Sequence, residues 1–73
     1  MFSKKVFANN LQREMSQRTM THAALANMLG VSRVAVTQFC TGANLPSIDT
    51  LVAIADILDI GLDELIGRDR KPD

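Results

Sequence analysis

The sequence predicts an all-α fold: a compact bundle of five short helices in one domain. The chain has 73 residues, which is room for a single small core. Apolar residues recur at helical spacing, and no segment alternates in polarity for the length of a strand. Trp and Tyr are absent and only three Phe occur, so the core must consist mainly of aliphatic and Met side chains.

The first helix is predicted to follow Ser3, because serine is a favourable N-cap residue. Phe7, Leu11 and Met15 then lie four residues apart and share one face. Residues 17–20 are mostly polar and are predicted to form a connection. Thr21 is the expected N-cap of the second helix, whose remaining residues to position 29 are mostly strong helix formers.

The third helix follows the second after a very short turn. Gly30 is expected to end the second helix in a left-handed conformation, and Ser32 to cap the third. Val36 and either Phe39 or Cys40 are expected to face inward. Residues 41–46 contain Gly and Pro and are predicted to form a loop.

Two more helices complete the predicted domain. The fourth is capped by Ser47 and is expected to be the most buried, because it has a wide apolar arc: Ile48, Leu51, Val52, Ile54, Ala55 and Leu58. The fifth spans residues 62–66. We expect residues 1–67 to be the domain and residues 68–73 a flexible charged tail, a composition that equally suits the start of a linker.

Charge is unevenly distributed although the net charge is zero. Residues 1–45 hold five basic residues and one acidic residue, whereas residues 46–73 hold three basic and seven acidic residues. This asymmetry favours a polyanionic partner for the first half, with ordinary surface variation as the alternative. The acidic residues of the second half lack the spacing of a calcium loop and indicate a solvated face.

Residues 21–42 have the pattern of a helix-turn-helix motif formed by the second and third helices. A small Ala26 lets the helices approach, Gly30 and Val31 form the turn, and Val36 packs back against the second helix. This segment resembles the lambda-repressor and Cro type of helix-turn-helix family. The resemblance extends from the motif through the segment that starts at Pro46, and covers roughly residues 6–67.

The resemblance implies a sequence-specific regulator that binds double-stranded DNA with its third helix in the major groove. It assigns Arg33 to guanine, Val34 to a thymine methyl group and Gln38 to adenine. The full set of implied base-reading residues is Ser32, Arg33, Val34, Gln38 and Asn44. The implied phosphate contacts are Thr21, His22, Thr37 and Thr41. Ordinary solvent-exposed surface is the alternative for His22, Arg33, Gln38 and Asn44.

Two positions depart from the family pattern. Met15 and Cys40 stand where family members often carry an Arg–Glu pair, and both are apolar, which is the tolerated way to lose a buried ion pair. The loop after Gly42 lacks the Lys or Arg common in the family. We therefore expect few phosphate ion pairs and a modest salt dependence.

A near-palindromic operator and repression by a homodimer are the expected mode of action. The predicted dimer surface comprises apolar residues near the end of the chain: Ile60, Leu62, Leu65 and Ile66. An antitoxin-like module that mainly binds another protein is the alternative. We expect no enzyme activity, cofactor, metal or small-molecule ligand, because one Cys and no nucleophile–base arrangement are present. A cytoplasmic location without a membrane anchor is expected.

Overall fold

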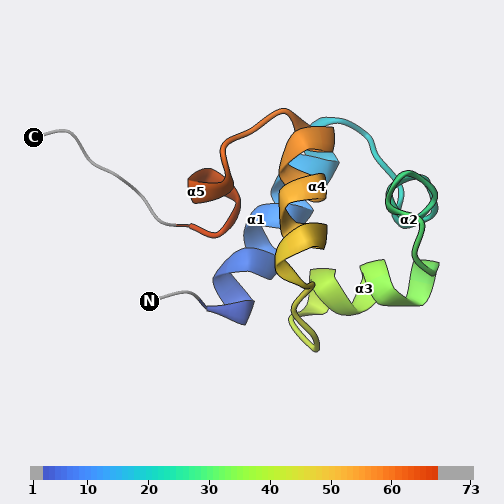
Figure 1. Cartoon of the computed structure of the whole chain (residues 1–73), viewed down its shortest axis with the longest axis horizontal. Helices are drawn as coiled ribbons and strands as arrows, with labels where there is room; N and C mark the ends of the chain where they lie inside the picture. The colour runs from blue at the N-terminus through green and yellow to red at the C-terminus, as the bar shows by residue number, and fades with distance from the viewer. Residues whose placement is uncertain (1–2, 68–73) are drawn as a thin grey trace, which may run out of the picture.

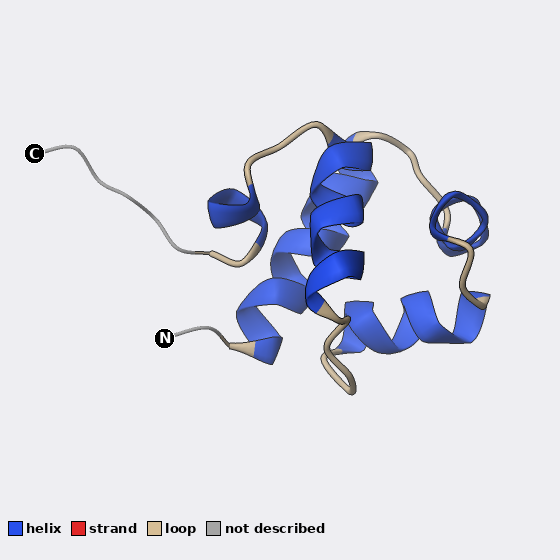
Figure 2. Ribbon diagram, viewed as in Figure 1, coloured by secondary structure: helices blue, strands red, loops and turns tan. Residues whose placement is uncertain are grey.

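The computed structural model describes residues 3–67, to which all structural statements below refer. Within them the chain forms helices and no strand, as predicted (Figure 2). The helices are α1 (Lys4–Gln17), α2 (His22–Leu29), α3 (Arg33–Thr41), α4 (Ile48–Leu58) and α5 (Leu62–Leu65). The tail predicted over residues 68–73 lies outside the described residues.

Hydroxyl side chains start four of these helices. The Oγ of Ser3, Ser32 and Ser47 and the Oγ1 of Thr21 each accept a hydrogen bond from the backbone N–H three residues later, at 3.0–3.3 Å. Each bond satisfies one of the donors that a helix leaves unpaired in its first turn. All four predicted N-caps are therefore confirmed. Thr41, expected in the loop, is instead the last residue of α3.

The core lies between the five helices, each of which contributes buried residues to it. α1 packs against α3 and α5, and α2 packs against α3 and α4 (Figure 1). The predicted stripe of Phe7, Leu11 and Met15 is buried in this core. The other helices contribute Leu25, Ala26, Val36, Phe39, Cys40, Leu51, Ile54, Ala55, Leu58 and Leu65.

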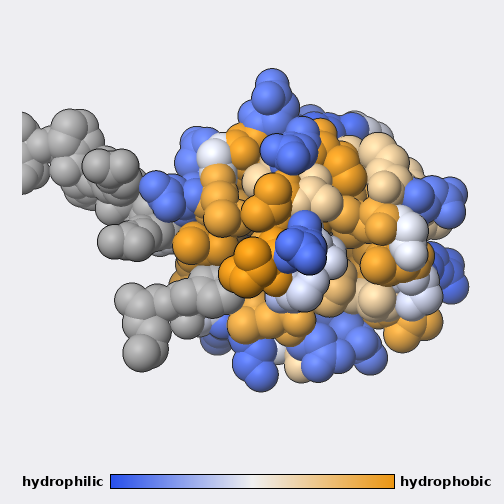
Figure 3. Space-filling model, viewed as in Figure 1, coloured by the Kyte–Doolittle hydropathy of each residue, from blue (hydrophilic) through white to orange (hydrophobic). Residues whose placement is uncertain are grey.

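Only part of the apolar arc of α4 is buried. Leu51, Ile54 and Leu58 are buried, but Ile48 is 70% and Val52 43% exposed. These two residues lie one helical turn apart on the side of α4 that faces away from the core. Figure 3 shows apolar surface on the face of the molecule over which α4 runs.

The side chain of Arg18, which follows α1, forms a hydrogen bond to the C-terminal end of α4. Its guanidinium group donates to the carbonyl of Leu58 at 2.6 Å and to the carboxylate of Glu14 at 2.7 Å. The Leu58 carbonyl belongs to the last turn of α4, which lacks intrahelical partners. One arginine therefore joins α1 to α4.

The short helix α5 is held against α1 by a buried amide. The Nδ2 of Asn10 donates to the carbonyls of Glu64 and Leu65, at 3.4 and 3.2 Å. The chain then turns at Gly67, whose φ is 79°, and a Cβ there would collide with the side chain of Val6. The position of α5 is thus fixed by α1. No helix among residues 3–67 is long and apolar enough to cross a membrane.

Candidate nucleic-acid interface

A three-residue turn, Gly30 to Ser32, joins α2 and α3. Gly30 has a φ of 74°, a conformation that costs free energy for a residue with a Cβ. The N–H groups of Gly30 and Val31 both donate to the carbonyl of Ala26, at 2.9 and 3.1 Å. Ala26 is only 3% exposed, so a larger side chain would separate the two helices. The predicted motif geometry is confirmed.

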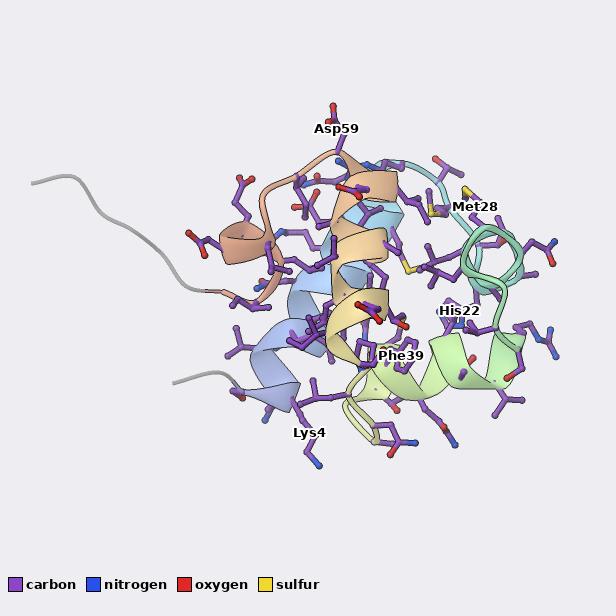
Figure 4. The ribbon with its side chains drawn as sticks, in the orientation of Figure 1. Lys4, His22, Met28, Phe39 and Asp59 are labelled. Carbon is purple, nitrogen blue, oxygen red and sulfur yellow. The ribbon has the colours of Figure 1, made fainter. Side chains whose placement is uncertain are left out.

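One face of α3 is buried, which leaves the opposite face directed to solvent. Val36, Phe39 and Cys40 point into the core, and Figure 4 shows Phe39 directed from α3 toward α4. Arg33 and Val34 therefore project from the outer side, and Val34 is 61% exposed. An apolar side chain held in solvent here makes no contribution to the core.

The outer side of α3 and the start of α2 form a shallow hollow of ≈ 410 Å³, here called the recognition surface. Its lining contains six of the nine residues predicted to touch DNA, together with Ala23. They are Thr21, His22, Arg33, Val34, Thr37 and Gln38. The fold therefore gathers most of the predicted residues on one surface.

His22 and Thr37 link the two helices across this surface. The Nδ1 of His22 lies 3.0 Å from the Oγ1 of Thr37, within hydrogen-bond distance. Figure 4 shows His22 in the space between α2 and α3. Two residues predicted to touch phosphate independently are thus joined, and their bond braces the start of α2 against α3.

The hydroxyl groups of the predicted site differ in what they can still donate. Those of Thr21 and Ser32 accept backbone bonds as caps, which leaves their O–H groups able to donate outward. Thr41 instead donates its O–H to the carbonyl of Gln38 at 3.2 Å. A phosphate oxygen needs a donor, so Thr41 is committed to the end of α3 in this structure.

Asn44 lies outside the lining residues but contacts one of them. Its Nδ2 donates to the Oε1 of Gln38 at 2.8 Å. The left-handed Gly42, with a φ of 82°, turns the chain so that the loop returns toward α3. The sequence indicated two separate base-reading amides, because Gln38 and Asn44 are six positions apart and only the turn brings them together.

Lys4 is a candidate contact that the sequence analysis missed. A Cβ at Gly42 would lie 3.7 Å from the backbone oxygen of Lys4, so the start of α1 borders the loop after α3. Lys4 is exposed, and Figure 4 shows it at the edge of the molecule along which α3 runs. Asp59 lies at the opposite edge. The excess of basic residues in the first half of the sequence was the available signal.

The four residues of the predicted dimer surface divide into two groups. Ile60, Leu62 and Ile66 are partly buried and keep some exposed surface. Leu65 is 0% exposed and belongs to the chain's own core. Leu65 therefore positions α5 and has no surface to offer a partner.

Cys40 and His22 border a common hollow. This hollow of ≈ 300 Å³ lies between α1, α2 and α3 and is also lined by Met15 and Met20. Cys40 is nevertheless buried, and burial raises the pKa of its thiol. A protonated, buried thiol is a poor nucleophile, so the cysteine is a core residue.

Comparison with known proteins identifies the fold. Residues 11–65 match the family model described as Helix-turn-helix. The chain belongs to the helix-turn-helix family. A relative from Bacillus subtilis, the uncharacterized HTH-type transcriptional regulator YqaE, is 36% identical over 61 residues, which are 84% of this chain and 53% of the relative. The cryptic phage CTXphi repressor RstR of Vibrio cholerae is 42% identical over 48 residues, or 66% of this chain and 43% of the relative.

Solved helix-turn-helix structures superpose closely. The SOS-response repressor LexA from Eubacterium rectale has a TM-score of 0.84 and 28% identity, covering 88% of this chain and 68% of its own. The P22 c2 repressor, solved with a synthetic operator, has a TM-score of 0.82 and 26% identity, covering 88% and 97%. The expected resemblance to the lambda-repressor type of helix-turn-helix is therefore confirmed.

The matches also define how far the likeness reaches. The chain spans about half the length of its curated helix-turn-helix relatives, 53% and 43%. A hydroxypropylphosphonic acid epoxidase from S. wedmorenis has a TM-score of 0.79 and 30% identity, but only 35% of that chain is covered. The likeness to this enzyme therefore leaves most of its chain unmatched, whereas both curated relatives carry the names of transcription regulators.

Proposed function

We propose that the chain binds duplex DNA sequence-specifically as a homodimer and represses transcription at a near-palindromic operator. The observation that carries this proposal is the recognition surface, where Arg33 and the 61% exposed Val34 project from a helix whose other face is buried. An α-helix of this kind fits the major groove of B-DNA. The likeness to two named repressors supports the same function.

Side chains at the start of α3 have the chemistry to read base edges. The guanidinium group of Arg33 can donate two hydrogen bonds to O6 and N7 of a guanine, and the methyl groups of Val34 can contact a thymine methyl. Ser32 keeps an O–H for a neighbouring base. No core contact requires Arg33 or Val34 to be these residue types, since both are exposed.

Phosphate contacts come from the start of α2. The first N–H groups of a helix carry partial positive charge and favour an anion, and Thr21 and His22 stand at this position. Thr37 adds a hydroxyl beside His22. These N–H, hydroxyl and imidazole groups orient the protein on the DNA backbone, while Lys4 supplies a full positive charge near the loop after α3.

Selection of bound sequences from random duplexes tests this proposal. Arg33→Ala should remove the preference at one base position and lower affinity for the selected duplex about 10- to 100-fold. Arg13→Ala is the matched control, because Arg13 is also an exposed arginine but lies outside the recognition surface. Unchanged preference in Arg33→Ala, or an equal loss in Arg13→Ala, would contradict the assignment.

The homodimer is tested by oligomeric state. Ile60, Leu62 and Ile66 are the apolar residues near α5 that remain available to a second copy. Two copies related by a twofold axis would place half-sites about one turn of DNA apart, roughly 34 Å. Sedimentation on the selected duplex should give two protomers per site, and a single protomer would exclude the dimer.

A further inference from the structure

The backbone carbonyl and the side chain of Gln38 both accept hydrogen bonds from residues that follow it in the chain. Its backbone carbonyl accepts from the N–H groups of Ala43 and Asn44, at 3.0 and 3.4 Å, and from the hydroxyl of Thr41. Its side-chain Oε1 accepts from the Nδ2 of Asn44 at 2.8 Å. The carboxamide of Gln38 is therefore oriented before any ligand arrives.

This bond changes what Gln38 can offer to a base. A glutamine reads adenine by a pair of bonds, in which its carbonyl accepts from N6 and its amide donates to N7. In this structure the carbonyl oxygen is directed to Asn44, and the Nε2 group retains two N–H donors. Two donors match guanine, which shows two acceptors at N7 and O6, and a donor matches thymine at O4, whereas adenine shows its N7 acceptor beside a donor at N6.

We propose that Asn44 is a specificity-determining positioning residue, which holds the Gln38 amide so that this position reads guanine or thymine rather than adenine. The proposal rests on the DNA-binding function above and replaces the adenine preference that the sequence indicated. It also gives the loop after α3 a role in recognition that does not require a basic residue. Asn44 acts through Gln38, so base preference and not affinity is its signature.

The experiment is selection from random duplexes with the full chain and four variants. Gln38→Ala identifies the base position concerned, because preference is lost there. In the unchanged protein that position should show guanine or thymine. Asn44→Ala frees the carbonyl of Gln38 and should raise the frequency of adenine relative to guanine or thymine about tenfold at that position.

Asn44→Asp provides a second test that keeps the size of the side chain. A carboxylate only accepts, so the amide of Gln38 should turn to donate to it and present its carbonyl to the base. Selection should then favour adenine or cytosine, which offer amino groups in the major groove. The control is Asn27→Ala, an exposed asparagine of α2 outside the recognition surface, which should leave every preference unchanged.

The outcomes separate this proposal from the function on which it rests. If the unchanged protein selects no sequence, the DNA-binding proposal fails. If it selects a sequence but shows adenine or cytosine at the Gln38 position, or if both Asn44 variants keep the original base there, only the positioning role fails. Retention of the Arg33-dependent preference in the Asn44 variants shows that α3 still docks, so a loss of fold is not mistaken for either result.

Discussion

The Sγ of Cys40 lies 3.8 Å from the Sδ of Met15, and both residues are 3% exposed. This contact joins α1 to α3 at the position where family members often carry an Arg–Glu pair. Two polarizable sulfur groups fill the space without the desolvation cost of burying two charges. The contact therefore joins α3 to α1 without a buried charge, beside the hydrogen bond from Gln12 Nε2 to the carbonyl of Cys40.

Restoring the charged pair tests this interpretation. Met15→Arg or Cys40→Glu alone should destabilise the fold by about 3–5 kcal/mol, because each buries an unpaired charge. The double variant should lose less than the sum of the two, since the charges pair across the same contact. Urea denaturation measures all three free energies of unfolding. Strict additivity would show that the two positions do not meet.

The thiol of Cys40 should be unreactive in the folded protein. Burial raises its pKa above the ordinary value of 9.0, so the folded state favours the protonated thiol over the reactive thiolate. Alkylation at neutral pH should therefore be slow and accelerate on addition of urea. By the same linkage, stability should be retained below pH 9.0 and fall as the pH rises above it. Fast labelling without denaturant would contradict the burial.

Arg18 and Arg13 both contact Glu14, yet they should differ in importance. Arg18 also donates to the carbonyl of Leu58, and its side chain is 31% exposed, whereas that of Arg13 is 55% exposed. Arg18→Ala should cost about 1 kcal/mol, a value reduced for solvent screening. Arg13→Ala should change stability by less than about 0.5 kcal/mol. Equal effects in thermal unfolding would remove the interhelical role of Arg18.

Local signals in the sequence were sufficient to predict the helices and the turn. A serine or threonine cap acts within three residues, and the φ of Gly30 is a property of one residue, so neither depends on the rest of the fold. Which residues of the apolar arc of α4 are buried could not be predicted from local signals. Ile48 and Val52 belong to the same apolar arc as Leu51, and only the packing of α4 against α2 and α5 decides which of them is covered.

In the candidate site too, features with local causes were predicted and features that depend on the path of the chain were not. Arg33 and Val34 were placed correctly on the outer side of α3, because the turn and the buried Val36 determine that side. The bond between Gln38 and Asn44 depends on the path of the loop after Gly42, and no spacing rule predicts it. The neighbourhood of Lys4 likewise depends on how α1 crosses α3.

Lys4 should contribute to affinity without contributing to base preference. If it neutralises one phosphate, Lys4→Gln should reduce the slope of log affinity against log salt concentration by about one unit. The selected sequence should be unchanged, because a phosphate contact carries no base information. Arg13→Gln serves as the control, an exposed cation outside the recognition surface. The same slope in Lys4→Gln and in the unchanged protein would show that Lys4 does not reach DNA.

Asn10 should couple the fold to the proposed dimer. It is 9% exposed and donates to the carbonyls of Glu64 and Leu65, which places α5, with its partly exposed Leu62, and the adjoining Ile66. Asn10→Asp keeps the size but replaces the donor by an acceptor, so the last turn of α5 loses its contact with α1. We expect a loss of about 1–3 kcal/mol in unfolding free energy.

The consequence for assembly distinguishes this role from a purely structural one. Because α5 carries the proposed dimer surface, its release should shift the sedimentation equilibrium toward the monomer before the rest of the chain unfolds. Asn9→Ala, an exposed neighbour on α1, should leave both stability and assembly unchanged. A dimer of unchanged affinity in folded but destabilised Asn10→Asp would place the dimer surface elsewhere, with the exposed Ile48 and Val52 of α4 as the next apolar residues to test.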